Sequence, residues 1–174
     1  MKDEYILDKF DVARYVLTEN KKRYKNDISI IKFHKTMYFM FAYWITILSM
    51  GKNKPSEIEE NLENLSDKLF DAKFAAWAYG PVDVELIELF RGGKIIEFSE
   101  EELKEFESQL NPVVSSYFEW AMNAMLSSGD FGLVELATRD ISWKMNYTPE
   151  SQYSNTMIDV DSIINEYQYP NRTL

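Results

Sequence analysis

Cysteine is absent from the 174 residues, and His34 is the only histidine. Without cysteine, a disulfide, a thiolate metal site and a cysteine nucleophile are all excluded. A Ser-His-acid triad would have to use His34, and no G-x-S-x-G segment is present to expose a nucleophilic serine. We interpret His34 as a structural or surface residue, with an interaction role and a catalytic role as the alternatives.

Carboxylates are numerous, but their spacing does not indicate catalysis or metal binding. Five glutamates between residues 100 and 107 crowd one expected helix start, where they complement the helix dipole. Asp159 and Asp161 lack the D-x-D-x-D-G context of a calcium loop and are explained by helix capping. No Walker A or G-x-G-x-x-G loop is present, and we interpret residues 91–94 as a helix stop. We predict no catalytic residue, metal or cofactor; an acid–base enzyme using Asp, Tyr and Lys is the alternative.

Charge is distributed unevenly along this acidic chain. The formal net charge is −10, and the sequence pI is about 4.7. Residues 1–54 contain 11 basic and 6 acidic side chains, whereas residues 55–174 contain 8 and 23. An acidic balance argues against a generic nucleic-acid binder, so we expect no direct nucleic-acid contact.

No targeting or membrane segment is predicted. The first five residues are polar and have no apolar region of the signal-peptide kind. The longest uncharged run, residues 36–50, has 15 residues, whereas a membrane span needs roughly 20 apolar ones. We therefore expect a cytoplasmic protein without membrane association.

Helical periodicity dominates the sequence. A segment at about 29–50, capped by Asp27 or Ser29, is apolar on almost every face, so we expect it to be the central helix of the core. Capping boxes at Ser56 and Ser99 open two further helices. The other helices are expected at about 8–24, 57–66, from Pro81 or Val82 to about 91, and at 99–110, 113–126, 130–139 and 159–167.

Two segments leave room for β-structure. Residues 74–79 precede Gly80-Pro81 and fit either a buried extended segment or a helix that ends at Tyr79. Residues 94–98 fit a short edge strand, and residues 147–155 are expected to form a long loop. The predicted fold is a single, mainly α, multi-helix domain over residues 1–174, with a minor β element near 74–79 or 94–98.

The aromatic residues of these elements have two interpretations. Trp77 and Tyr79 flank a rigid Gly-Pro turn, where they either pack the turn onto the central helix or form a contact hot spot for a partner. Trp143 is interpreted as a core anchor.

Two lysines of the central helix raise the same choice. Lys32 and Lys35 share one helix face with Tyr38. They are either solvated cations beside a core tyrosine or a basic, aromatic contact surface for an acidic partner.

Three segments, in the same order and at similar intervals, resemble the motifs of the Panacea domain family, the SocA-like antitoxins. They are residues 28–39, residues 69–82, and residues 133–136 with 143–144. The most specific is Ala-Trp-Ala-Tyr-Gly-Pro-Val at 76–82. The resemblance selects Lys32, Lys35, Tyr38, Trp77, Tyr79, Gly80, Pro81, Val82 and Trp143 as motif or partner-binding residues.

The chain departs from the family pattern at three places. His34 stands where the pattern often has glutamine, and Ala137-Thr138 stands where it often has Thr-His. If that histidine did chemistry in the family, this chain could not do the same. The segment at 51–67 is longer than usual, so we expect a surface insertion there.

The resemblance implies a non-enzymatic, helical protein of bacteria, phages or mobile elements that neutralises a partner toxin by direct contact. One family member instead delivers its toxin to a Clp-type protease, so a proteolytic adaptor is an alternative. A second alternative, from the charge, is an inhibitor of a host defence nuclease with a nucleic-acid-mimicking acidic surface. The sequence leaves open the partner, the oligomeric state and whether neutralisation is steric or protease-assisted.

Overall fold

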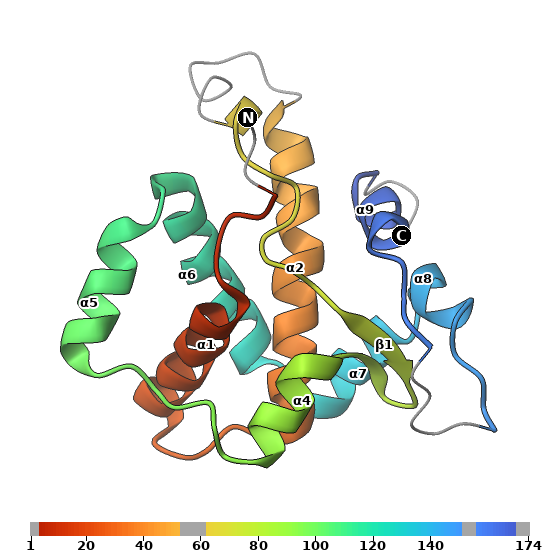
Figure 1. Cartoon of the computed structure of the whole chain (residues 1–174), viewed down its shortest axis with the longest axis horizontal. Helices are drawn as coiled ribbons and strands as arrows, with labels where there is room; N and C mark the ends of the chain where they lie inside the picture. Colours follow the sequence, from red (N-terminus) through yellow and green to blue (C-terminus); the bar gives the residue numbers. More distant parts are fainter. Residues whose placement is uncertain (1–3, 53–61, 151–155, 170–174) are drawn as a thin grey trace.

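Helix α2 (Ile30–Lys52) runs through the middle of the molecule, with other helices on several sides of it (Figure 1). The computed structural model describes residues 4–52, 62–150 and 156–169. Every residue from 33 to 42 is buried, which confirms the prediction of a central helix apolar on all sides. Ser29 caps it, because its hydroxyl accepts a hydrogen bond from the Lys32 amide at 3.0 Å.

The other helices arrange themselves around α2. Contacts with α2 come from α1 (Lys9–Tyr24), α6 (Pro112–Ser127), α7 (Asp130–Ala137) and α9 (Val160–Tyr167). The described part of the chain also contains α4 (Val84–Arg91), α5 (Glu100–Gln109) and α8 (Ile141–Lys144), and Phe90 of α4 stacks on Phe33 of α2. The capping box of Ser99 and the N-cap at Asp159 are confirmed. The mainly helical fold class is therefore confirmed.

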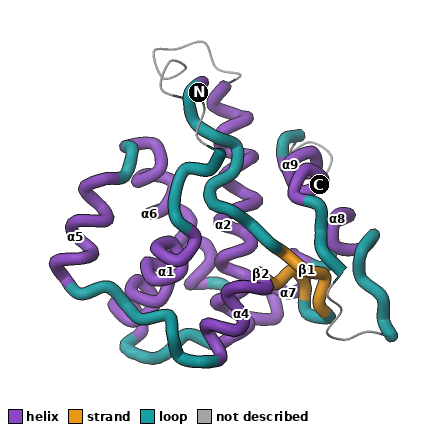
Figure 2. Tube along the Cα trace, in the orientation of Figure 1, coloured by secondary structure: helices purple, strands orange, loops and turns teal. Residues whose placement is uncertain are grey.

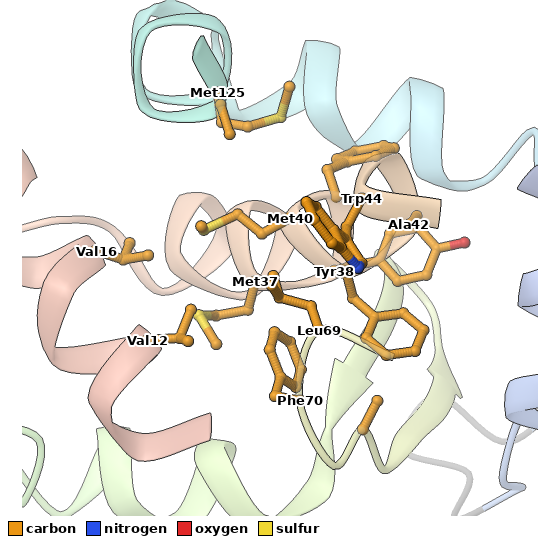
Figure 3. Packing of buried hydrophobic residues seen from close by; sticks show 14 of the residues in the cluster. Val12, Val16, Met37, Tyr38, Met40, Ala42, Trp44, Leu69, Phe70 and Met125 are labelled. Carbon is orange, nitrogen blue, oxygen red and sulfur yellow. The ribbon is translucent and has the colours of Figure 1, made fainter. Parts of the chain in front are cut away.

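Apolar side chains from these helices interlock along α2. Figure 3 shows Val12 and Val16 of α1 on one side of α2 and Met125 of α6 on another, with Leu69 and Phe70 closing a third. The largest enclosed side chain is Trp44, whose indole N–H donates to the Ser66 carbonyl at 2.9 Å. Its polar atom is therefore satisfied inside an otherwise apolar core.

A β-hairpin packs against the central helix. Strand β1 (Phe74–Trp77) pairs antiparallel with β2 (Gly80–Asp83). Of the two alternatives for residues 74–79, the extended one is right and the helix ending at Tyr79 is wrong. Proline at 81 disfavours helical backbone in the residue before it, and Gly80 has a φ of +100° that ends any helix.

One predicted boundary is wrong, and of the two segments considered for a minor β element, 94–98 does not form one. The helix expected from Pro81 or Val82 begins at Val84, because Asp83 is its N-cap and accepts from the amides of Glu85 and Leu86 at 3.0 and 3.2 Å. The strand expected at 94–98 is absent, and this segment is a loop. Its backbone is hydrogen-bonded to side chains of α1 and not to another strand. The Arg14 side chain donates to the Ile96 carbonyl, and the Phe98 amide donates to the Thr18 hydroxyl.

Other predictions fall partly on residues 53–61 and 151–155, outside the described part of the chain. They are the helix at 57–66 with its Ser56 capping box, the surface insertion at 51–67, and the end of the loop at 147–155. Within the described ranges, none of the helices combines the length and apolar character needed to cross a bilayer.

A buried ion pair ties α1 to the start of α4. The Lys9 ammonium lies 3.0 Å from the Asp83 carboxylate, and neither side chain is appreciably exposed. The same carboxylate caps α4 and accepts from the Lys73 amide at 3.0 Å. Since Asp83 also ends β2, its side chain fixes the hairpin, α1 and α4 relative to one another.

We predict that Asp83→Ala lowers the free energy of unfolding by at least about 3 kcal/mol, because it leaves a buried ammonium with one half-exposed partner, Glu85, and removes a helix cap. Urea unfolding measures the loss. The matched control is Asp159→Ala, which removes only an exposed cap and should lower it by about 1 kcal/mol. Equal losses in the two variants would contradict the role assigned to Asp83.

Candidate functional site

A pocket opens where the hairpin meets the first turns of α2. Strand β2 contacts α2, α4 and α7, and the hairpin lies beside α4 in Figure 2. The cavity has a volume of about 240 Å³. Its walls are mostly apolar and are formed by Ile30, Ile31, His34, Lys35, Trp77, Ala78, Tyr79, Val82, Ile87 and Arg91.

Lys35 forms part of the wall and is only 1% exposed. Its ammonium donates to the Pro81 carbonyl at 2.5 Å, and no carboxylate pairs with it within the described residues. Burial lowers the pKa of Lys35 to about 7. The interpretation of Lys35 as a solvated cation is therefore wrong, because this side chain joins α2 to the hairpin.

The absence of a side chain at Gly80 leaves room for the Lys35 ammonium. A Cβ atom at residue 80 would lie 3.1 Å from the Lys35 Nζ and 3.1 Å from the Ala137 Cβ. The φ of +100° would also strain any other residue there. Gly80 and Pro81 are buried and do not line the cavity, so their part is to position Lys35 and the turn.

His34 is packed as a neutral ring. It is 2% exposed, and its ring lies edge-on to Phe33 and Phe90 at centroid distances of 4.9 and 5.7 Å. Burial, followed by the positive charges of Lys35 and Arg91, lowers its pKa to about 3. Neither ring nitrogen has a hydrogen-bond partner in the described part of the chain. This environment agrees with the structural interpretation of His34.

Aromatic side chains form the mouth of the pocket. Tyr79 is 55% exposed in the hairpin turn, and the Arg91 guanidinium lies 5.4 Å from the centroid of the half-buried Trp77 ring. The Trp143 indole donates to the Trp77 carbonyl at 2.8 Å and stacks on Tyr147. Trp143 is buried, so its prediction as a core anchor is confirmed. Its hydrogen bond to the Trp77 carbonyl joins α8 to the hairpin turn.

The predicted surface of Lys32, Lys35 and Tyr38 does not form. Lys32 donates to the Leu126 carbonyl at 3.2 Å and lies 3.7 Å from Asp130, away from the pocket. Tyr38 is fully buried, as the core interpretation expected. Among the predicted residues, the pocket brings together Lys35, Trp77, Tyr79 and Val82.

One buried polar cluster was missed from the sequence. The Asp140 carboxylate accepts hydrogen bonds from the hydroxyls of Tyr38 and Tyr167, the latter at 2.7 Å. Burial raises the pKa of Asp140 to about 6, against the opposing effect of the two tyrosine hydrogen bonds. The neighbouring Glu166 raises it further, whereas Lys144 lowers it. Three distant segments supply the cluster, so no local pattern could have indicated it.

Arg91 and the isoleucines of α2 were also missed as site residues. The sequence placed Arg91 at a helix stop, which is correct, but the spacing of α4 gives no sign of which face meets Trp77. Within the described ranges, no three His, Asp or Glu side chains gather where they could hold a metal ion. The lining of the pocket is instead mostly apolar and includes two basic side chains, Lys35 and Arg91.

We predict that Asp140→Asn removes a pH dependence of stability. An acid whose pKa is higher in the folded state favours folding less as it ionises, so wild-type stability falls between pH 3.8 and about 6. Across this pH window the free energy of unfolding of the variant should rise relative to that of wild type by on the order of 3 kcal/mol. Denaturant unfolding at pH 4 and pH 7 measures the difference, and a difference that stays constant with pH would contradict it.

Comparison with known proteins assigns the chain to no family. No protein-family model, no curated protein and no solved structure matches the chain. The candidate site is therefore defined by its geometry alone.

Proposed function

We propose that this chain is a non-enzymatic protein-binding module of the Panacea type, which neutralises a partner toxin in the cytoplasm by direct contact. One observation carries the proposal. Two Panacea-like segments, residues 28–39 and 69–82, come together from separate parts of the sequence to line a single apolar pocket with an exposed tyrosine at its mouth.

The chemistry of the pocket supports binding over catalysis. Tryptophan and tyrosine are the residues most enriched at the energetic centres of protein interfaces, and both stand at this opening. The lining residues include no Asp, Glu, Ser or Thr, so the one histidine has no acidic or hydroxyl neighbour in the wall. A Ser-His-acid triad or a pair of carboxylates therefore cannot form from the lining residues, whereas chemistry at Lys35 would not need such a pair.

The nuclease-inhibitor alternative has one observation in its favour. Helix α5 exposes Glu100, Glu101, Glu105 and Glu107. However, Glu102 of the same helix is part of the capping box and bonds to Arg14 at 3.0 Å. Helix-start and solvation charge therefore explain part of this acidic surface, and we prefer the pocket as the contact site.

Co-expression tests the proposal. The product of the gene adjacent to this one in its source genome is produced in a bacterial host, and growth is followed with and without this chain. We expect wild type to restore growth and Tyr79→Ala to restore it poorly, because loss of an interface hot spot weakens binding by about 2 kcal/mol or more, roughly 30-fold.

Tyr5→Ala is the matched control, since this tyrosine is also exposed, at 41%, and does not line the pocket. It should protect as well as wild type. Full protection by Tyr79→Ala, or no protection by wild type against the adjacent product, would refute the proposal. Inhibition of a purified nuclease that is lost on changing the exposed α5 glutamates to glutamine would favour the alternative. A fall in toxin abundance that requires a Clp-type protease would indicate the adaptor.

A further inference from the structure

Two cations flank the pocket without an acidic partner. Arg91 is exposed at the mouth, and no carboxylate forms an ion pair with it within the described residues. Lys35 is enclosed in the wall, where a backbone carbonyl is its hydrogen-bond acceptor. Arg91 therefore carries a positive charge beside the pocket that no carboxylate of the described residues pairs with, and Lys35 adds a second one when it is protonated.

The surroundings of Arg91 strengthen this conclusion. Glu88 lies one turn earlier on α4 and is exposed, but it makes no ion pair with Arg91. The guanidinium instead lies over the Trp77 ring, which restricts its orientation while leaving its N–H groups available. A planar, oriented guanidinium is well suited to bind a carboxylate through two parallel hydrogen bonds.

The cavity beside these cations is apolar. Its volume of about 240 Å³ exceeds the roughly 150 Å³ that holds a benzene molecule in an engineered cavity. Ile30, Ile31, Val82 and Ile87 contribute aliphatic surface, and Trp77 and Tyr79 add aromatic faces. One aromatic or branched side chain of a partner would fit there and would gain from leaving water.

We propose that the pocket binds a protein segment in which a large apolar side chain stands within two residues of an aspartate or glutamate. The apolar side chain fills the cavity, and the carboxylate pairs with the Arg91 guanidinium at the mouth. In its protonated form Lys35 adds attraction from inside the wall without a direct contact. This inference rests on the proposed protein-binding function and specifies the chemistry of the partner.

Selection of peptides tests it. A phage-displayed library of random peptides is selected on the full chain, and a synthetic peptide of the resulting consensus is titrated by calorimetry. We expect a consensus with an acidic residue within two positions of an aromatic or branched one. Arg91→Gln should weaken the peptide at least about tenfold, which is typical of losing a charged hydrogen bond.

A double-mutant cycle separates the pairing from general effects. Replacing the acidic residue of the peptide by its amide should weaken wild type by the same factor and leave Arg91→Gln almost unaffected. Arg139→Gln is the matched control, because Arg139 is an exposed arginine that pairs with Glu135 and does not line the pocket. It should bind the peptide as wild type does.

A consensus without an acidic residue, no selected peptide, or equal affinity of wild type and Arg91→Gln would overturn the inference. Growth rescue distinguishes this failure from failure of the proposed function. If Tyr79→Ala loses protection while Arg91→Gln protects fully, the pocket binds a partner but not through a carboxylate. If neither variant loses protection, both proposals fail.

Discussion

The contact between the Lys35 ammonium and the Pro81 carbonyl is the interaction on which the pocket depends. It joins the central helix to the hairpin at the point where the chain must turn sharply. Gly80 is required beside it, because a side chain there would meet the ammonium and adopt a strained backbone. Trp143 secures the same turn from the other side through the Trp77 carbonyl. The pocket walls are therefore held by polar bonds at the turn as well as by apolar packing.

Burial of this lysine is unfavourable by itself. A charged group removed from water without an ionic partner destabilises the folded state, and the lowered pKa of Lys35 expresses that cost. The neighbouring His34 has unpartnered ring nitrogens, a second unfavourable feature in the same wall. The apolar packing along α2 offsets both. Polar groups retained at a pocket despite their cost are typical of sites selected for function as well as stability.

Local signals in the sequence predicted most of the helices. Caps such as Ser99 and Asp159 act on adjacent backbone amides, so their effect can be recognised without tertiary structure. The boundary of α4 was misplaced by two or three residues because Pro81 was interpreted as the first residue of the helix, whereas Asp83 is its cap and accepts from the Glu85 and Leu86 amides. Residues 94–98 look like a strand but are satisfied by side chains of α1, which no local pattern could reveal.

The sequence predicted only some of the residues that form the candidate site. Lys35, Trp77, Tyr79 and Val82 were selected by their motifs, and the structure brings them to one pocket. Arg91 and the Asp140 cluster were not found, because each depends on which faces of distant helices meet. The burial of Lys35 was also missed, since a lysine on an apolar helix is more often at the surface.

Titration of Lys35 tests the account most directly. The ε-methylene signals of the lysines, assigned by comparison with Lys35→Arg, are followed by NMR from pH 5 to pH 11. An ammonium enclosed between α2 and the hairpin turn should titrate near pH 7, well below the ordinary lysine value of about 10.4. A Lys35 midpoint near that ordinary value would show an exposed side chain and would contradict the structure of the pocket wall.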